Sequence, residues 1–211
     1  NAALAADGLP NDQRALLLID RGVARARLGQ PRAALDDFNR AIQLVPEGAT
    51  AYNNRGTVLL EIGATAEAIR DFDRALLLAP SYAAAFANRA AAHVRLGNHR
   101  AALGDYSRAI GLLQTDGAAF AGRGRVHLAQ GRPHAALRDL GRALAVAPRF
   151  APALRARAEA YLALERYKDA IDDLGRVLEI DRDNIEVILL RGYAAIAARD
   201  IPAALRDFQH A

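Results

Sequence analysis

A fixed spacing of 34 residues constrains this chain more than any other feature of its sequence. One alanine recurs at this interval without a slip, at Ala34, Ala68, Ala102, Ala136, Ala170 and Ala204. A single period of this length is typical of repeat proteins, in which each repeat is one supersecondary unit that stacks on its neighbours. The sequence therefore predicts one continuous array rather than separate globular domains, although 211 residues would be enough for two.

Two further rows of residues keep the same step and differ in size. The bulky row is Phe38, Phe72, Tyr106, Leu140, Leu174 and Phe208. The small row is Gly22, Gly56, Ala90, Gly124, Ala158 and Gly192. Small residues let two helix backbones approach closely, and bulky residues fill the space around the contact. We therefore expect both rows, together with the alanine row, to build the core.

Residues 49–82 show the structure expected of one repeat. Tyr52 and Gly56 stand at helical spacing, and Gly63 is a helix-ending signal. A second apolar stripe at helical spacing follows, and it consists of Ala68, Ile69, Phe72, Ala75 and Leu76. Pro80 then stops the second helix. The segment predicts two antiparallel helices of about 13 residues each, joined by a short turn.

This pattern resembles the tetratricopeptide repeat family, whose signature falls here at Tyr52, Gly56, Ala68, Phe72, Ala75 and Pro80. The resemblance covers residues 15–211 and implies an all-α fold, a right-handed α-solenoid of helix–turn–helix repeats. The expected repeats are 15–48, 49–82, 83–116, 117–150, 151–184 and the partial repeat 185–211, preceded at 1–14 by the remnant of an earlier helix and a linker. Glu165 and Arg199 replace the turn glycine, a departure that concerns the local turns and not the fold.

Two charged rows also repeat every 34 residues. The arginines are Arg21, Arg55, Arg89, Arg123, Arg157 and Arg191, and the acids are Asp37, Asp71, Asp105, Asp139, Asp173 and Asp207. A guanidinium beside the packed stripe needs a partner, so we expect cross-helix bridges such as Arg55–Asp71. The alternative is an ordinary surface pair between each acid and the arginine three residues later. If these bridges form, Arg89→Leu should be tolerated better than Asp105→Leu, because loss of Asp105 leaves the half-buried Arg89 guanidinium unpaired.

The resemblance also implies where a partner would bind, because the first helices of such repeats line a concave groove. The residues opposite the packed stripe that we select as binding candidates are Asn53, Asn54, Thr57, Asn88, Arg125, Arg155, Glu159 and Tyr193. They predict a groove that is polar early in the chain and apolar at its far end. Asn54 and Asn88 are equivalent residues of adjacent repeats, which would suit backbone recognition of an extended peptide. The alternative is that Asn is simply common at this place in the repeat.

The sequence offers little support for catalysis or for metal binding. His93 and His127 are equivalent residues on the packed stripe, where a core role is expected. The chain has no cysteine and no Gly-rich phosphate loop after a strand. We therefore predict that it is not an enzyme and needs no cofactor or metal. A net charge of +4 without a basic run argues against nucleic acid, and the apolar stretches are too short for a membrane span.

The function expected from these features is a non-enzymatic scaffold that binds a peptide or a partner helix in the concave groove. Two alternatives remain open at this point. In the first, the array is a docking or regulatory segment of a larger enzyme. In the second, it is a scaffold that self-assembles as a homo-oligomer through uncapped ends. The absence of cysteine and the start at Asn1 favour the bacterial periplasm over the cytoplasm.

Overall fold

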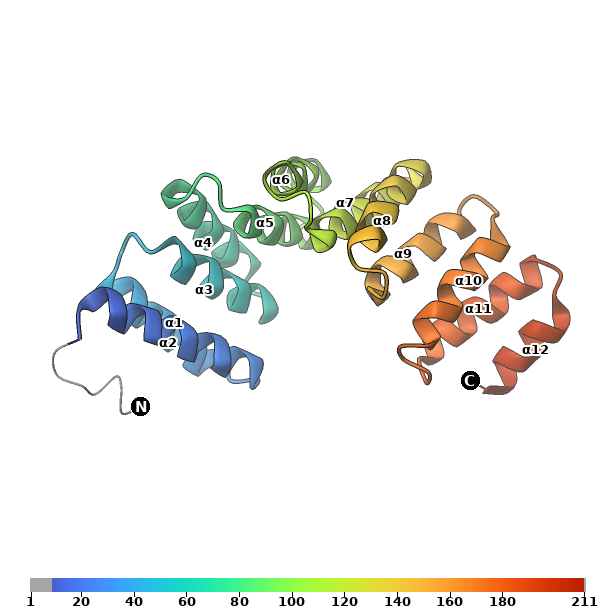
Figure 1. Ribbon diagram of the computed structural model, residues 1–211, viewed down its shortest axis with the longest axis horizontal. Coiled ribbons are helices and arrows are strands. Elements are labelled where there is room, and N and C mark those ends of the chain that lie inside the picture. The colour runs from blue at the N-terminus through green and yellow to red at the C-terminus, as the bar shows by residue number, and fades with distance from the viewer. Residues whose placement is uncertain (1–8, 211) are drawn as a thin grey trace. The chain divides into compact units, whose positions relative to one another are not determined.

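The structure is a computed structural model that describes residues 9–210, and these residues form antiparallel helix pairs (Figure 1). Within this range lie α1 (Asn11–Arg27), α2 (Pro31–Leu44), α3 (Ala49–Glu61), α4 (Thr65–Leu78), α5 (Ala83–Arg95), α6 (His99–Leu112), α7 (Gly117–Ala129), α8 (Pro133–Val146), α9 (Ala151–Leu162), α10 (Tyr167–Leu178), α11 (Ile185–Ala197) and α12 (Ile201–His210). Residues 9–210 contain no strand. The predicted all-α fold of consecutive helix pairs, typical of an α-solenoid, is confirmed.

The chain divides between Leu112 and Leu113 into two compact units. Unit 1 contains the helix pairs α1–α2, α3–α4 and α5–α6, and unit 2 contains α7–α8, α9–α10 and α11–α12. Inside each unit every helix packs against the next one in the chain, so each pair also contacts the pair that follows it. Helix α1 begins at Asn11, one turn before the expected repeat boundary. The remnant helix expected near the N-terminus lies mostly in residues 1–8, outside the described part of the chain.

Proline marks several helix boundaries. Pro31 and Pro133 are the first residues of α2 and α8, where a missing N–H costs little because it has no partner inside the helix. Pro46 and Pro80 follow the ends of α2 and α4 by two residues, where the ring prevents the helix from continuing. The chain therefore reverses at nearly the same place in each repeat.

The glycines of the small row meet the bulky row inside their helix pairs. A Cβ built on Gly56 would lie 2.7 Å from Cε1 of Phe72, and one on Gly22 would lie 2.6 Å from Cε1 of Phe38. Real Cβ atoms essentially never show such distances, so at these two positions glycine permits the observed approach of the backbones. The alanine row lies deep in the same interface, since Ala68 has no exposed surface. The predicted core rows are confirmed.

The turn between the two helices of a repeat keeps a left-handed residue even where glycine is absent. The glycines Gly29, Gly63, Gly97 and Gly131 have φ values of 70°, 87°, 72° and 68°. Glu165 and Arg199 occupy the same turn position with φ values of 57° and 63°. An L-residue pays roughly 1–2 kcal/mol in this conformation, because its Cβ crowds the following carbonyl oxygen. The two departures from the repeat pattern therefore strain their turns but do not change the turn geometry.

The arginine and aspartate rows pair across the two helices of every repeat. The Nε and Nη2 atoms of Arg55 donate to the two carboxylate oxygens of Asp71, at 2.7 and 2.6 Å. The same two-pronged pairing recurs in the five other repeats. This hydrogen bond is the main cause of the raised pKa of the Arg55 guanidinium, and burial opposes it. The expected cross-helix bridges are confirmed, and the i,i+3 contact accompanies the bridge at Asp173, where Arg176 lies 3.4 Å away.

The acid is the more deeply buried member of these pairs. In the first repeat, the side chain of Asp37 is 1% exposed, whereas that of Arg21 is 24% exposed. A guanidinium that loses its partner can therefore reach water, whereas a stranded carboxylate cannot. This difference in burial reverses the expected order of the two leucine substitutions. Arg89→Leu should lower the free energy of unfolding more than Asp105→Leu, because it leaves the buried Asp105 carboxylate without a partner.

Candidate functional site

One pocket recurs at the same position in two repeats, once in each unit. The pocket in unit 2 has a volume of about 500 Å³ and that in unit 1 about 210 Å³. Each is formed by the first helix of a repeat, the end of its second helix and the start of the next first helix. The equivalent lining residues, four repeats apart, are Ala15 and Ala151, Leu16 and Pro152, Ile19 and Arg155, Ala41 and Val177, Val45 and Asp181, Gly48 and Asn184, and Ala51 and Val187. We call them the unit 1 pocket and the unit 2 pocket.

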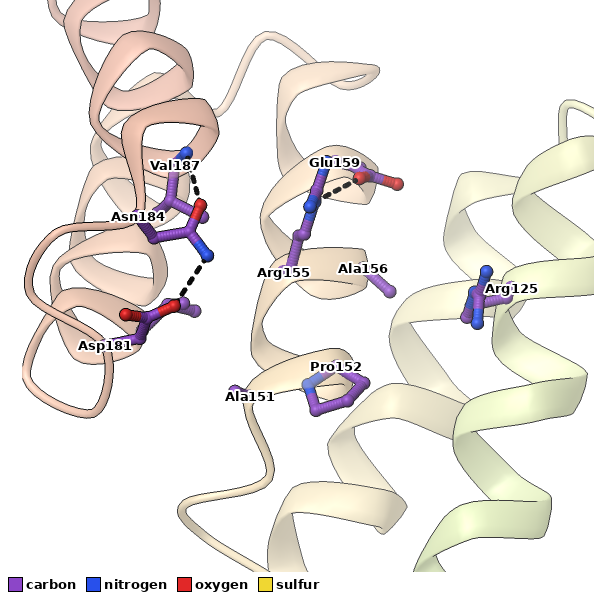
Figure 2. Close-up of a pocket in the computed structure, with 10 residues that line it drawn as sticks. Arg125, Ala151, Pro152, Arg155, Ala156, Glu159, Asp181, Asn184 and Val187 are labelled. Atoms are coloured by element: carbon purple, nitrogen blue, oxygen red, sulfur yellow. Dashed lines mark hydrogen bonds and ion pairs between the residues drawn. The ribbon is translucent and has the colours of Figure 1, made fainter. Parts of the chain in front are cut away.

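The unit 2 pocket is the more polar of the two, and several of its polar side chains contact one another. Arg155 on α9 contacts Glu159 at 3.4 Å through Nε and Glu186 at 3.0 Å through Nη1. Asn184 caps α11, since its Oδ1 accepts from the Val187 backbone N–H at 3.2 Å. Its Nδ2 donates to Asp181 at 2.8 Å, and Figure 2 shows both bonds as dashed lines. These contacts fix the wall of the pocket before any partner arrives.

Arg125 on α7 is the one lining cation that the structure leaves available. Its side chain reaches the same pocket from a different helix than Arg155 (Figure 2). Arg125 is exposed, and it forms no ion pair with any residue in the range 9–210. A guanidinium in this state binds a carboxylate without first breaking an internal bond. The predicted residues Arg125, Arg155 and Glu159 are therefore brought together in one pocket.

The unit 1 pocket has the opposite chemistry. Leu16 and Ile19 of α1 line it together with Val45, and the polar groups are limited to Asp12 and Thr50. The side chain of Leu16 is 60% exposed, so the apolar wall is accessible from solvent. This pocket belongs to the first repeat, ahead of the residues for which the polar-to-apolar progression of the groove was predicted, so that progression stays a prediction.

The predicted asparagines form a hydrogen-bond network between α3 and α5 of unit 1. Asn88 Nδ2 donates to Asn53 Oδ1 at 3.0 Å and to Thr57 Oγ1 at 3.3 Å. Asn53 Nδ2 in turn donates to Asn54 Oδ1 at 3.2 Å, and Asn53 is only 5% exposed. Within residues 9–210, Asn54 Nδ2 and Asn88 Oδ1 have no partner in this network. The network thus leaves the Asn54 Nδ2 donor and the Asn88 Oδ1 acceptor available, while Asn53 and Thr57 hold the two side chains in place by hydrogen bonds.

Tyr193 lies apart from both pockets. Its side chain is 62% exposed on α11, and its ring meets the Phe208 ring edge-on with 5.4 Å between centroids. The apolar residues Ile196, Ile201 and Leu205 of the same helix pair are also exposed. The structure therefore does not join Tyr193 to the other predicted residues of unit 2.

Sequence reasoning missed Leu16, Ile19 and Val45 of the unit 1 pocket and Asp181 and Asn184 of the unit 2 pocket. A signal for the first group was present: Ile19 stands four periods before the predicted Arg155. Asp181 and Asn184 lie in the loop before α11 rather than on a helix face, so helical phase alone does not select them.

His127 of the packed stripe lies beside a cross-helix bridge. His127 Nε2 lies 3.8 Å from Asp139 Oδ2, beside the Arg123 bridge. Burial is the main cause of the lowered pKa of His127, and Asp139 only partly offsets it. In residues 9–210 no three side chains of the metal-binding types are grouped so that they could hold an ion. No helix in this range is both long and apolar enough to span a membrane.

Comparisons with known proteins agree with the fold. A family model described as tetratricopeptide repeat matches residues 19–83 and 122–185. Among solved structures, the chain is similar to PilW, a type IV pilus biogenesis factor (TM-score 0.85, 21% identity, 92% of this chain and 90% of that one). It is also similar to TTC0263 of Thermus thermophilus (TM-score 0.73, 22% identity, 86% of this chain and 99% of that one). A third similar structure is MamA (TM-score 0.64, 19% identity, 82% of this chain and 94% of that one). Identities this low establish the fold alone. No curated protein sequence matches the chain.

Proposed function

Because the chain belongs to the tetratricopeptide repeat family, we propose that it is a non-enzymatic scaffold that binds a segment of a protein partner along the first helices of its repeats. The partner contributes a peptide or a helix. One observation carries the proposal: a pocket of the same construction lies beside the first helix of two different repeats. A core-forming repeat has no need of such a pocket, whereas a binding surface uses it to receive side chains.

The two pockets select different side chains. The unit 1 pocket takes an apolar side chain, because Leu16, Ile19 and Val45 offer it little but hydrocarbon. The unit 2 pocket takes an acidic side chain, which meets the available guanidinium of Arg125. Arg155 is already engaged by Glu159 and serves mainly to shape the wall.

The asparagine network adds a contact for the backbone of the bound segment. Asn54 Nδ2 donates and Asn88 Oδ1 accepts, which matches the C=O and N–H groups of an extended peptide. Their hydrogen bonds to Asn53 and Thr57 hold both amides in position. Such preorganisation lowers the entropic cost of binding.

Site-specific photocrosslinking tests which face binds. A photoreactive phenylalanine analogue is placed at Leu16 or Pro152, the equivalent rim positions of the two pockets. The matched controls are Arg70 on α4 and Arg206 on α12, exposed and equally four repeats apart. We expect partner segments to be captured from Leu16 and from Pro152, each located by its mapped crosslinks, and not from Arg70 or Arg206. Equal capture from the second-helix positions would contradict binding along the first helices.

Self-association is a second candidate, favoured by the exposed apolar face of α12. Leu205 is 55% exposed, whereas Ile69, its equivalent four repeats earlier, packs on a cluster that includes Ala92 of the next helix pair. A second copy would cover Leu205 in the way the next pair covers Ile69. Sedimentation over a range of concentrations tests this: the size should rise with concentration, and Leu205→Asp should abolish the rise. A constant monomer size would exclude it.

A further inference from the structure

Two bridging arginines of unit 1, Arg55 and Arg89, have a second partner on the preceding repeat. Arg55 and Arg89 use Nε and Nη2 for the aspartate of their own helix pair. The remaining Nη1 of Arg55 donates to Asn39 Oδ1 at 2.7 Å, and that of Arg89 donates to Asp73 Oδ1 at 2.6 Å. Both acceptors stand 16 residues before their arginine. In these two repeats the third nitrogen therefore ties the repeat to the one before it.

At the last bridging arginine of unit 2, glycine replaces this acceptor. The residue 16 positions before Arg191 is Gly175. Nε and Nη2 of Arg191 bind Asp207 at 3.0 and 2.5 Å, as the pattern requires. A Cβ built on Gly175 would lie 3.8 Å from Arg191 Nη1, so the guanidinium sits directly over the missing side chain. Across residues 9–210 the structure gives that nitrogen no acceptor.

A pocket of about 570 Å³ occupies the place of the missing side chain. Besides Gly175 and Arg191, it is lined by Arg176 and Arg182, and by the two acids Asp172 and Glu179. Arg176 is held in place by the Pro148 carbonyl oxygen, which accepts from its Nη2 at 2.7 Å. None of these residues lines the unit 2 pocket. It is therefore a separate site, on the side of α10 and α11 that the proposed groove does not use.

We propose that this pocket binds the carboxylate of an acidic side chain on a protein partner. The bound carboxylate takes the place beneath Arg191 that Asp73 takes beneath Arg89, with one oxygen on Nη1. Arg182 supplies further donors at the rim. A singly charged carboxylate suits the pocket better than a phosphate group, because Asp172 and Glu179 repel a second negative charge. The partner thus completes an interaction that unit 1 makes internally.

Substitution of Gly175 provides a sharp test, because the missing group is supplied from within the chain. Gly175→Asn and Gly175→Asp introduce the acceptors found at Asn39 and Asp73, and Gly175→Ala adds only the Cβ as a matched control. The Cβ fits, since 3.8 Å is an ordinary contact. Asn avoids repulsion from Asp172 and Glu179, so it remains informative if Asp folds poorly.

Arginine side-chain NMR reports binding of two probes, sodium acetate and the blocked peptide acetyl-Gly-Asp-Gly-amide, at constant ionic strength with chloride as the reference salt. We expect saturable shifts of the Arg191 signal with both probes in the parent and in Gly175→Ala. In Gly175→Asn the affinity should fall about tenfold or more, which corresponds to loss of a charge-assisted hydrogen bond. Equal affinities in Gly175→Ala and Gly175→Asn, or shifts no larger than with chloride, would overturn the site. Binding of acetate without the peptide would overturn the assignment to a protein side chain.

Discussion

Arg89 and Asp105 join the two helices of their repeat, with Arg89 Nε 2.7 Å from Asp105 Oδ2 and Nη2 2.8 Å from Oδ1. The same arginine reaches back to Asp73 of the preceding repeat at 2.6 Å. The acid of the pair is 12% exposed and the arginine 22%. One side chain therefore holds two repeats together, and its removal strands a buried carboxylate.

Leucine substitutions of the two bridge residues should lower the free energy of unfolding by different amounts. Arg89→Leu should destabilise the chain by about 3 kcal/mol, since it leaves Asp105 buried without a partner. Asp105→Leu should cost about 1–2 kcal/mol, because Arg89 keeps Asp73 and access to water. Urea unfolding of both variants and of the double variant measures this. The bridge account fails if Asp105→Leu is the more costly change, or if the two effects simply add.

The close approach of α3 and α4 makes Gly56 intolerant of a methyl group. Gly56→Ala should lower the free energy of unfolding by about 1–3 kcal/mol, because the new Cβ would lie 2.7 Å from Phe72. Gly104→Ala is the control, since a Cβ there meets no atom within 4 Å. That change should raise stability by about 0.5–1 kcal/mol through reduced backbone freedom in the unfolded chain. Thermal melts that rank the two variants equally would argue against steric exclusion.

The strained turn at Glu165 offers a stabilising substitution. Glu165→Gly should raise the free energy of unfolding by about 0.5–1 kcal/mol, because glycine adopts φ 57° without crowding and this outweighs its extra freedom when unfolded. Gly131→Ala, at the same turn position one repeat earlier, should lower it by a similar amount. Chemical denaturation of the pair checks both signs. A destabilising Glu165→Gly would mean that the side chain contributes more than its backbone costs.

His127 predicts a pH dependence of stability. Burial lowers its pKa in the folded chain, so below the ordinary value of about 6.5 the unfolded chain binds the proton more readily. Stability should therefore fall as the pH drops from about 7 through the lowered pKa of His127. His127→Leu, which introduces the residue type of the equivalent Leu59, should flatten this part of the profile, and His134→Gln controls for removal of an exposed histidine. An unchanged slope in His127→Leu would assign the pH dependence elsewhere.

The fold was predictable because each row of the repeat has one physical role. Gly56 and Phe72 are complementary in size, and Arg55 and Asp71 in charge, so their partners could be inferred from spacing alone. The strain at Glu165 could not, since a turn imposes its φ on whatever residue occupies it. The relative burial of Arg89 and Asp105 was also hidden. Sequence places both beside the core but does not say which side chain keeps more contact with water once the helices are packed.

The candidate site was predictable only in part. Arg125, Arg155 and Glu159 share a pocket because helical phase sets which side of a first helix they occupy. Asn53 faces its neighbours instead, since hydrogen bonding to Asn88 compensates its burial. Helical phase cannot reveal residues such as Asn184, which reaches the pocket from a helix cap.

Binding of the partner segments crosslinked at each pocket, as purified peptides, to variants of the two pockets tests the central claim most directly. Leu16→Asp places a charge in the unit 1 pocket and Arg125→Glu reverses the available charge of the unit 2 pocket, while Arg70→Glu makes the same charge reversal on an exposed second helix. By calorimetry, each pocket variant should bind about tenfold or more weakly, as expected for loss of a central contact, with unchanged melting temperature. Arg70→Glu should bind like the parent. Parent-like affinity in both pocket variants would contradict the proposal that these pockets receive the partner.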